Sequence, residues 1–174
     1  MRLPDLITEY QRNYLPKFKC ELRWYANRPT LRDAIDLAAR ARWKEGKKLS
    51  HQWHIKNETL QIAASKLILI ERQLVSSTTF NDIIERVEAN IRSIWGIGSL
   101  TIYDTSLRIG AKIGNFPTEV YLHAGAKDGA RKLLGETYIR GKQKISKSSF
   151  SRHFEILKPC EIENFLCVMR KQLQ

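Results

Sequence analysis

The sequence predicts an all-α protein, and three observations support this prediction. Apolar residues recur at helical spacing along most of the chain, strand-like alternation is scarce, and glycine and proline cluster in short stretches typical of tight connections. A chain of 174 residues with an ordinary share of apolar side chains can bury a hydrophobic core. We therefore expect a compact single helical domain over residues 1–174, or two small helical lobes that share one core.

Side chains that can cap a helix precede several of the apolar repeats. Thr30 and Thr79 are each expected to accept a hydrogen bond from the backbone at the start of a helix. Asn57 is expected to cap a long helix that continues to Leu74. The last segment, from Cys160 to Leu173, has apolar residues at helical spacing and is expected to pack as a helix.

The charge of the chain indicates a polyanionic partner. Thirty Lys and Arg residues against 18 Asp and Glu give a formal net charge of +12, and the sequence pI is near 9.8. Nucleic acid is the usual partner of such a protein, because binding to phosphates releases condensed counterions. The alternatives are a charge that serves only solubility and a membrane-surface protein. We expect no membrane partner, because no apolar run approaches the ~20 residues that span a bilayer and the N-terminus, MRLPDLITEY, does not resemble a signal peptide.

The three cysteines, Cys20, Cys160 and Cys167, form an odd set without CxxC spacing. Reduced thiols in the cytoplasm are therefore the simplest interpretation, and a disulfide framework or an iron–sulfur cluster is not expected. His51 and His54 have no cysteine nearby, which favours surface or phosphate-contacting histidines over a metal site. We expect neither a metal nor a cofactor.

Two stretches concentrate the positive charge. The first runs from Arg40 to Lys56 and the second from Arg140 to Arg152, each beside predicted turns. Lys and Arg side chains with hydroxyl and amide neighbours can donate many hydrogen bonds to phosphate oxygens, whereas a solvated loop without a partner is the alternative. In the second stretch, the candidate DNA phosphate ligands are Lys142, Lys144 and Lys147.

The most informative segment is the glycine pair Gly96 and Gly98 between two predicted helices. A sharp hairpin there is expected to require glycine backbone angles at both positions and to let a DNA backbone approach closely. The unpaired N–H groups of the second helix, which is expected to begin near Ser99, then point at a phosphate. Ile97 is expected to pack between the two helices, and Trp95 beneath the hairpin.

This segment resembles the helix-hairpin-helix motif, in which Gly-apolar-Gly is followed, after two variable positions, by Thr and a small or apolar residue. The pattern is matched in order and spacing by Gly96, Ile97, Gly98, Thr101 and Ile102, within a motif at about residues 80–113. The resemblance implies that DNA phosphate is bound by Gly96, Gly98, Ser99 and Thr101. A helix–helix turn without a ligand is the alternative.

The surroundings of the motif resemble the helix-hairpin-helix DNA glycosylase superfamily over roughly residues 80–134. A long helical region precedes the motif, and a break at residues 114–117 follows its second helix. Bifunctional members carry a catalytic Lys at the second position after the glycine pair, where this chain has Leu100. Because no amine is present to form a Schiff base, the resemblance implies a monofunctional glycosylase that uses water.

Two carboxylates are candidates for the catalytic acid or base. In the superfamily an essential Asp follows the proline-containing break, and here Glu119 lies close to that position. Asp104 lies four residues after Leu100, one helical turn along the same face. A carboxylate at either position can stabilise an oxocarbenium-like sugar and orient an attacking water. The alternatives are an ion pair between Asp104 and Arg108 and a first-turn acid at Glu119.

A base that is to be excised must leave the duplex for a pocket, which is usually lined by aromatic side chains. The candidates for that pocket are Trp43, Trp53, Tyr103, Tyr121 and His123. Most aromatic residues belong to the core and a lone histidine is more often structural, so the sequence does not select among these five.

Our leading hypothesis is a monofunctional DNA glycosylase that flips and excises a modified or damaged base from double-stranded DNA and leaves an abasic site. The short chain and its departures from the superfamily pattern favour a divergent member, either in anti-phage defence against modified bases or in the repair of alkylated bases. A non-catalytic helix-hairpin-helix DNA-binding protein is the alternative. A nuclease is disfavoured, because no metal-binding carboxylate cluster stands out in the sequence. We expect a monomer in the cytoplasm, associated with the nucleoid.

Overall fold

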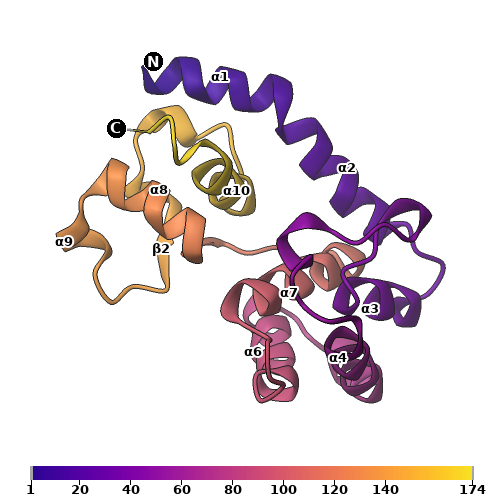
Figure 1. Cartoon of the computed structure of the whole chain (residues 1–174). Coiled ribbons are helices and arrows are strands. Elements are labelled where there is room, and N and C mark those ends of the chain that lie inside the picture. Colours follow the sequence, from indigo (N-terminus) through magenta and orange to yellow (C-terminus); the bar gives the residue numbers. More distant parts are fainter. Residues whose placement is uncertain (1, 174) are drawn as a thin grey trace. The chain divides into compact units, whose positions relative to one another are not determined.

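The computed structural model describes residues 2–173 and confirms the all-α class (Figure 1). Ten α-helices account for most of these residues, and their only sheet has two short strands. The chain divides into two compact units, one made of Met1–Lys19 with Pro117–Gln174 and the other of Cys20–Phe116. Each unit has its own cluster of buried apolar side chains. Within residues 2–173, no helix is both long and apolar enough to cross a bilayer.

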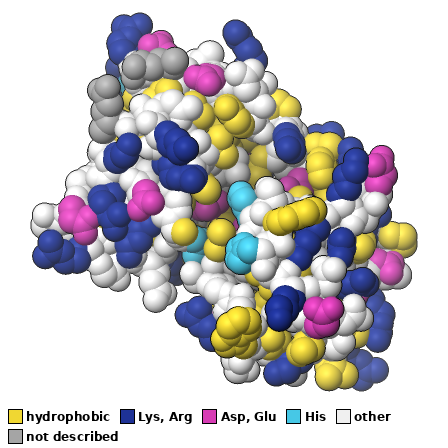
Figure 2. All heavy atoms as spheres, in the orientation of Figure 1, with side chains coloured by type: hydrophobic (Ala, Val, Ile, Leu, Met, Phe, Trp, Pro, Cys, Tyr) yellow, Lys and Arg dark blue, Asp and Glu magenta, His cyan; other side chains and the backbone are white. Residues whose placement is uncertain are grey.

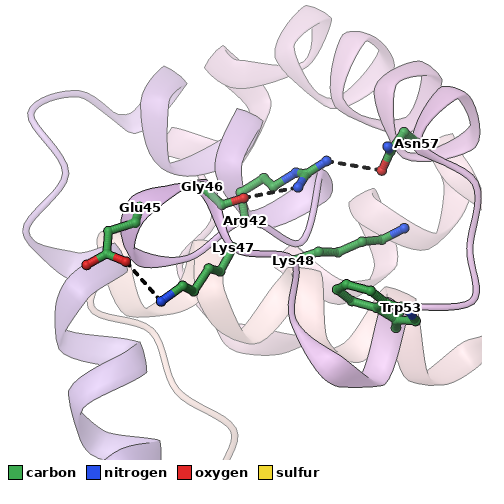
Figure 3. Close-up of a pocket in the computed structure, with 7 residues that line it drawn as sticks. All are labelled: Arg42, Glu45, Gly46, Lys47, Lys48, Trp53 and Asn57. Atoms are coloured by element: carbon green, nitrogen blue, oxygen red, sulfur yellow. Dashed lines mark hydrogen bonds and ion pairs between the residues drawn. The ribbon is translucent and has the colours of Figure 1, made fainter.

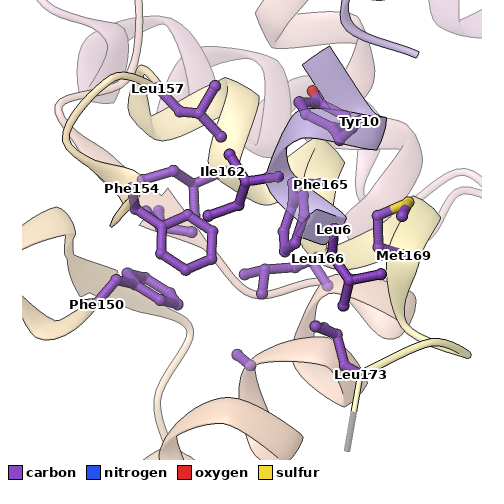
Figure 4. Close-up of a cluster of buried hydrophobic side chains, with 14 of the residues drawn as sticks. Leu6, Tyr10, Phe150, Phe154, Leu157, Ile162, Phe165, Leu166, Met169 and Leu173 are labelled. Carbon is purple, nitrogen blue, oxygen red and sulfur yellow. The ribbon is translucent and has the colours of Figure 1, made fainter. Parts of the chain in front are cut away.

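The first unit is built around a C-terminal helix. Its elements are α1 (Leu3–Asn13), the start of α2 (Leu15–Ala26), β1 (Glu119–Tyr121), α8 (Ala124–Leu134), α9 (Glu136–Ile139), β2 (Lys144–Ser146), the 3-10 turns η3 (Lys147–Ser149) and η4 (Arg152–Phe154), and α10 (Pro159–Met169). The two strands pair antiparallel, with Val120 opposite Ile145. In the core, the ring of Phe165 packs edge-on against those of Tyr10 and Phe154 (Figure 4). The last helix was expected to continue to Leu173, whereas α10 ends at Met169.

The second unit carries the predicted motif. Its elements are the remainder of α2, α3 (Leu31–Ala39), the 3-10 turns η1 (Lys44–Gly46) and η2 (Ser50–Gln52), α4 (Asn57–Leu69), α5 (Glu71–Val75), α6 (Phe80–Ile91) and α7 (Ser99–Ile113). Helix α7 packs against both α3 and α6. It is the most buried helix of this unit, and its early residues define the candidate site described below.

The predicted helix starts at Thr30 and Thr79 are confirmed. Each hydroxyl accepts a hydrogen bond from the backbone N–H three residues later, and an aspartate at that position completes a capping box. The prediction at Asn57 is wrong: Asn57 is the first residue of α4, and the cap position before it is held by Lys56. The long helix expected there is also interrupted, because the backbone leaves helical geometry at Ile70. The break directs Leu74 of α5 into the core.

Candidate nucleic-acid interface and carboxylate site

The hairpin between α6 and α7 has one strained glycine, not two. Gly96 has a φ of +89°, in the left-handed region that favours glycine, and a Cβ there would lie 3.8 Å from the Thr59 methyl group. Gly98 has a φ of −103°, which any residue adopts, so the expectation of a glycine-specific angle at both positions is wrong. A Cβ at Gly98 would meet no protein atom within 4 Å. The fold therefore requires glycine at Gly96, and it leaves open space in front of Gly98.

The first turn of α7 presents unpaired backbone donors. Gly98 is the N-cap residue and has no side chain that could accept from the backbone. The helical ladder begins with the bond from Ile102 N–H to Gly98 O at 3.1 Å, so the N–H groups before it lack an intrahelical partner. No acidic residue lies in this turn. Ser99 is exposed and Thr101 is buried, so contact between Thr101 and a phosphate would go through its backbone N–H.

The two apolar residues of the hairpin have different environments. Ile97 is buried in the core of the second unit, as predicted. Trp95 is 85% exposed, so the prediction that it packs beneath the hairpin is wrong. The left-handed turn at Gly96 lies between these two residues, and it directs the second of them inward while the first stays in solvent. The sequence pattern did not distinguish these two orientations.

Asp104 projects from α7 into a cluster of polar side chains from η2. Gln52 Nε2 donates a hydrogen bond to Asp104 Oδ2 at 2.5 Å, and His51 Nδ1 lies 3.5 Å from the same oxygen. Arg108 Nη2, one helical turn further, lies 3.5 Å from it as well, so the Asp104–Arg108 pair weighed from the sequence is present. Among residues 2–173, every hydrogen bond and ion pair of the Asp104 side chain goes through Oδ2. The side chain is 12% exposed.

Arg108 ties this cluster to α2. Its guanidinium is 5% exposed and donates to Glu21 Oε1 at 3.0 Å through Nε and to Gln52 Oε1 at 3.4 Å through Nη2. The guanidinium also lies over the ring of Tyr25, 5.8 Å from the ring centre. Its buried Nη1 has no hydrogen-bond partner among the described residues. One buried cation thus serves two carboxylates, which offsets much of the cost of burying these charges.

The cluster favours an ionised Asp104. Burial alone would raise the pKa of this carboxyl, but the hydrogen bond from His51 and the positive charge of Arg108 lower it, and the net direction is downward. The same hydrogen bond raises the pKa of His51 above its ordinary value, although burial acts in the opposite direction. His51 is 46% exposed, so the pair joins a fixed carboxylate to an imidazole that solvent can reach.

The aromatic candidates for a base pocket have very different exposures. Tyr103 is fully buried and packs edge-on against Phe80. Trp43 is partly buried against the core of the second unit, whereas Trp53 in the same unit is 71% exposed. The other two candidates, Tyr121 and His123, are buried in the first unit, where their rings stack with centres 6.0 Å apart. Of the five, only Trp53 offers an exposed ring.

The remaining candidates belong to the first unit. Glu119 lies in β1, outside any helix, and pairs with Lys144 Nζ at 2.5 Å. Lys147 donates to the backbone carbonyl of Glu155 at 2.8 Å, and Lys142 Nζ lies 3.4 Å from the centre of the Tyr138 ring. Each of these side chains therefore has a partner within its own unit. A DNA phosphate would have to compete with these contacts.

The sequence did not identify His51 and Gln52 as partners of the candidate carboxylate. Asp104 and Arg108 are four residues apart on one helix, a spacing visible in the sequence, but η2 lies far away along the chain. No local pattern links His51 to Asp104.

Comparisons with known proteins identify no relative of this chain. No protein-family model, no curated protein and no solved structure matches it.

Proposed function

We propose that the protein binds double-stranded DNA through the α6–α7 hairpin and acts as a monofunctional DNA glycosylase with Asp104 as its catalytic carboxylate. The observation that carries this proposal is the state of Asp104. It lies in the second turn of the helix whose first turn has unpaired N–H groups, its pKa is lowered, and three side chains hold one of its oxygens. The net charge of +12 supports a DNA partner, and Lys and Arg side chains are spread over the face seen in Figure 2.

The chemistry of base excision suits such a carboxylate. As the bond between the sugar C1′ and the base nitrogen breaks, positive charge develops on the sugar. A fixed negative charge in a partly buried site stabilises that charge more than a mobile one in water does. Asp104 Oδ1 is available to orient the water that adds to C1′. His51 acts as a positioning residue, because its hydrogen bond to Oδ2 keeps the carboxylate ionised and in one orientation.

A non-catalytic DNA-binding protein is the second candidate. The observation that favours it is the set of contacts between Arg108, Glu21 and Gln52, which links α2, η2 and α7 through buried polar groups. Such a network can serve the fold alone. Asp104 would then be one more partner of Arg108, and the hairpin would bind the DNA backbone without any reaction.

The experiment that separates these candidates is release of bases by the purified protein from plain, alkylated and deaminated DNA and from phage DNA with modified cytosines. Strand breaks that appear only after alkali or an abasic-site endonuclease would establish a monofunctional glycosylase. Asp104→Asn is expected to lower base release by about 100-fold or more and to change DNA affinity by less than about threefold. Asparagine keeps the shape of the side chain, and circular dichroism checks the fold.

Glu119→Gln is the matched control, because it removes the other candidate carboxylate. We expect it to retain base release, and loss of release in this variant alone would transfer the catalytic role to Glu119. Tight, salt-sensitive binding without abasic sites on any of the DNAs would instead favour the non-catalytic protein.

Binding by the hairpin has a separate test in Gly98→Ala. The added methyl group meets no protein atom within 4 Å and the backbone angle suits alanine, so the melting temperature is expected to stay unchanged. The methyl group would occupy the space through which a phosphate reaches the first turn of α7, and we expect affinity for duplex DNA to fall by about tenfold. Fluorescence anisotropy measures the affinity. Wild-type affinity in this variant would exclude the hairpin as the phosphate site.

A further inference from the structure

A pocket of about 780 Å³ opens beside the 3-10 turns of the first basic stretch (Figure 3). It is lined by Arg42, Glu45, Gly46, Lys47, Lys48, Trp53 and Asn57. Lys47 pairs with the single acid, Glu45, at 2.9 Å. Arg42 and Lys48 make no ion pair among residues 2–173. The pocket therefore holds two positive charges that no carboxylate of its own neutralises.

Hydrogen bonds to neutral oxygens hold these two cations in place. Arg42 donates to the backbone carbonyl of Gly46 at 3.0 Å and to Asn57 Oδ1 at 3.1 Å, and Lys48 donates to the carbonyl of Ile55. An antiparallel bridge joins the backbones of Arg42 and Lys48. Burial and, to a smaller extent, the nearby charge of Arg42 lower the pKa of Lys48, whereas the carboxylate of Glu58 acts in the opposite direction. A bound anion would relieve the repulsion between the two cations.

The backbone of the loop is also fixed in a costly conformation. Glu45 has a φ of 58° and Ala41 one of 51°, values that residues other than glycine rarely adopt. Each of these two backbone conformations costs of order 1 kcal/mol. The hydrogen bonds from Arg42 to Gly46 and Asn57 offset this cost and hold the loop closed. Arg42 and Lys48 are therefore held in one arrangement before any ligand binds.

An aromatic ring forms one wall of the pocket. In Figure 3 the Trp53 ring and the Lys48 side chain lie on the same side of the loop, and the Arg42 guanidinium reaches toward Asn57. A tryptophan that is 71% exposed leaves a large apolar face in water. Nucleobases stack on such faces without regard to sequence, and adjacent cations bind the connecting phosphates.

The pocket and the hairpin meet at the start of one helix. Asn57 lines the pocket and begins α4, while Thr59 in the same turn lies next to Gly96 of the hairpin. A strand whose backbone is held at the hairpin would thus have a second binding position nearby, within the same unit.

We propose that this pocket binds one unpaired nucleotide of a DNA strand, with its base stacked on Trp53 and its phosphate held by Arg42 and Lys48. The inference rests on the proposed DNA-binding function. It specifies which form of DNA the pocket recognises, namely a nucleotide that has left the stack of the duplex. Base excision is not required for it, since a non-catalytic protein could hold such a nucleotide equally well.

The test compares two single strands of equal charge, pentathymidylate and a pentamer of abasic residues. The wild-type protein is expected to bind pentathymidylate about tenfold more tightly than the abasic pentamer, with quenching of tryptophan fluorescence by the bases. Trp53→Leu is expected to abolish both the preference and most of the quenching. This side chain is largely in solvent, so its replacement leaves the core intact.

The phosphate contact is tested by Lys48→Gln against Lys66→Gln. Both variants lose one positive charge from the same unit, and Lys66 is an exposed residue in the last turn of α4. We expect Lys48→Gln to weaken binding of both pentamers by about fivefold, and Lys66→Gln to leave both within about twofold. Equal losses in the two variants would overturn the proposal in favour of diffuse attraction. The proposal of a nucleotide site would also be overturned if the wild type bound the two pentamers equally tightly, or bound inorganic phosphate as tightly as pentathymidylate. In either case the pocket would be a site for anions only.

None of these measurements depends on the release of bases. Absence of abasic sites in the excision experiment would therefore not affect this proposal, and failure of the stacking preference would not affect the assignment of Asp104.

Discussion

The basic stretch at residues 40–56 and the basic stretch at residues 140–152 use their positive charge differently. In the first, Arg42 and Lys48 are bonded to uncharged oxygens around an open pocket, so their charges remain available to an anion. The nearby Trp53 adds an exposed ring.

In the second stretch, the three candidate lysines also have partners within the fold, and one of these partners is a carboxylate. Lys144 pairs with Glu119, Lys142 lies over the ring of Tyr138, and Lys147 donates to a backbone carbonyl. Only the first of these interactions neutralises a charge. Lys147 keeps its charge, as Lys48 does, because both side chains donate to a neutral carbonyl oxygen. The comparison shows that the number of cations in a segment does not predict their availability, which depends on acids elsewhere in the fold.

The largest difference expected between the two stretches is in DNA affinity after two cations of either stretch are neutralised. Arg42→Gln/Lys48→Gln is expected to weaken duplex DNA binding by at least about tenfold and to reduce the salt slope by roughly 0.9 for each phosphate that the protein no longer neutralises. Lys144→Gln/Lys147→Gln removes the same net charge and is expected to weaken binding by less than about threefold. Titrations over a series of salt concentrations measure both quantities. If the second double variant loses as much affinity as the first, availability of the cations is not what separates the two stretches.

Local features of the fold could be predicted from the sequence. The capping threonines Thr30 and Thr79 act on residues three positions away, and the burial of Ile97 follows from its place in the hairpin pattern. The ion pair between Asp104 and Arg108 follows from helical spacing. Each of these predictions depends on neighbours within one or two turns of the chain, where helical geometry fixes the distances.

The features that escaped prediction depend on distant segments. His51 reaches Asp104 only because the loop before α4 packs against α7, and no periodicity encodes that contact. The orientation of Trp95 depends on the left-handed turn at Gly96. The break in the helix at Ile70 depends on how α5 packs in the core. The candidate carboxylate could therefore be named from the sequence, whereas the side chains that hold it in place could not.

The smallest expected effect is the change in stability when His51 titrates. His51 belongs to the first stretch and contacts the buried carboxylate of Asp104, a contact that has no counterpart among the candidate lysines of the second stretch. Its pKa is raised in the folded protein because it donates to Asp104. The protonated form therefore stabilises the fold, and this contribution is complete below the pKa of the unfolded chain and is lost as the pH rises through the folded pKa. We expect the melting temperature to fall by about 1–2 °C across that range, a small effect because the side chain is half exposed.

Two measurements test this effect. The NMR titration of the His51 ring in the wild type is expected to give a pKa above that of the same ring in Asp104→Asn, where the charge of the partner is absent. The melting temperature of His51→Gln is expected to lose the fall of about 1–2 °C that the titration of His51 causes in the wild type. An unchanged His51 pKa in Asp104→Asn would mean that the two side chains are not coupled in solution. His51 would then have no positioning role, and the first stretch would differ from the second only in its pocket.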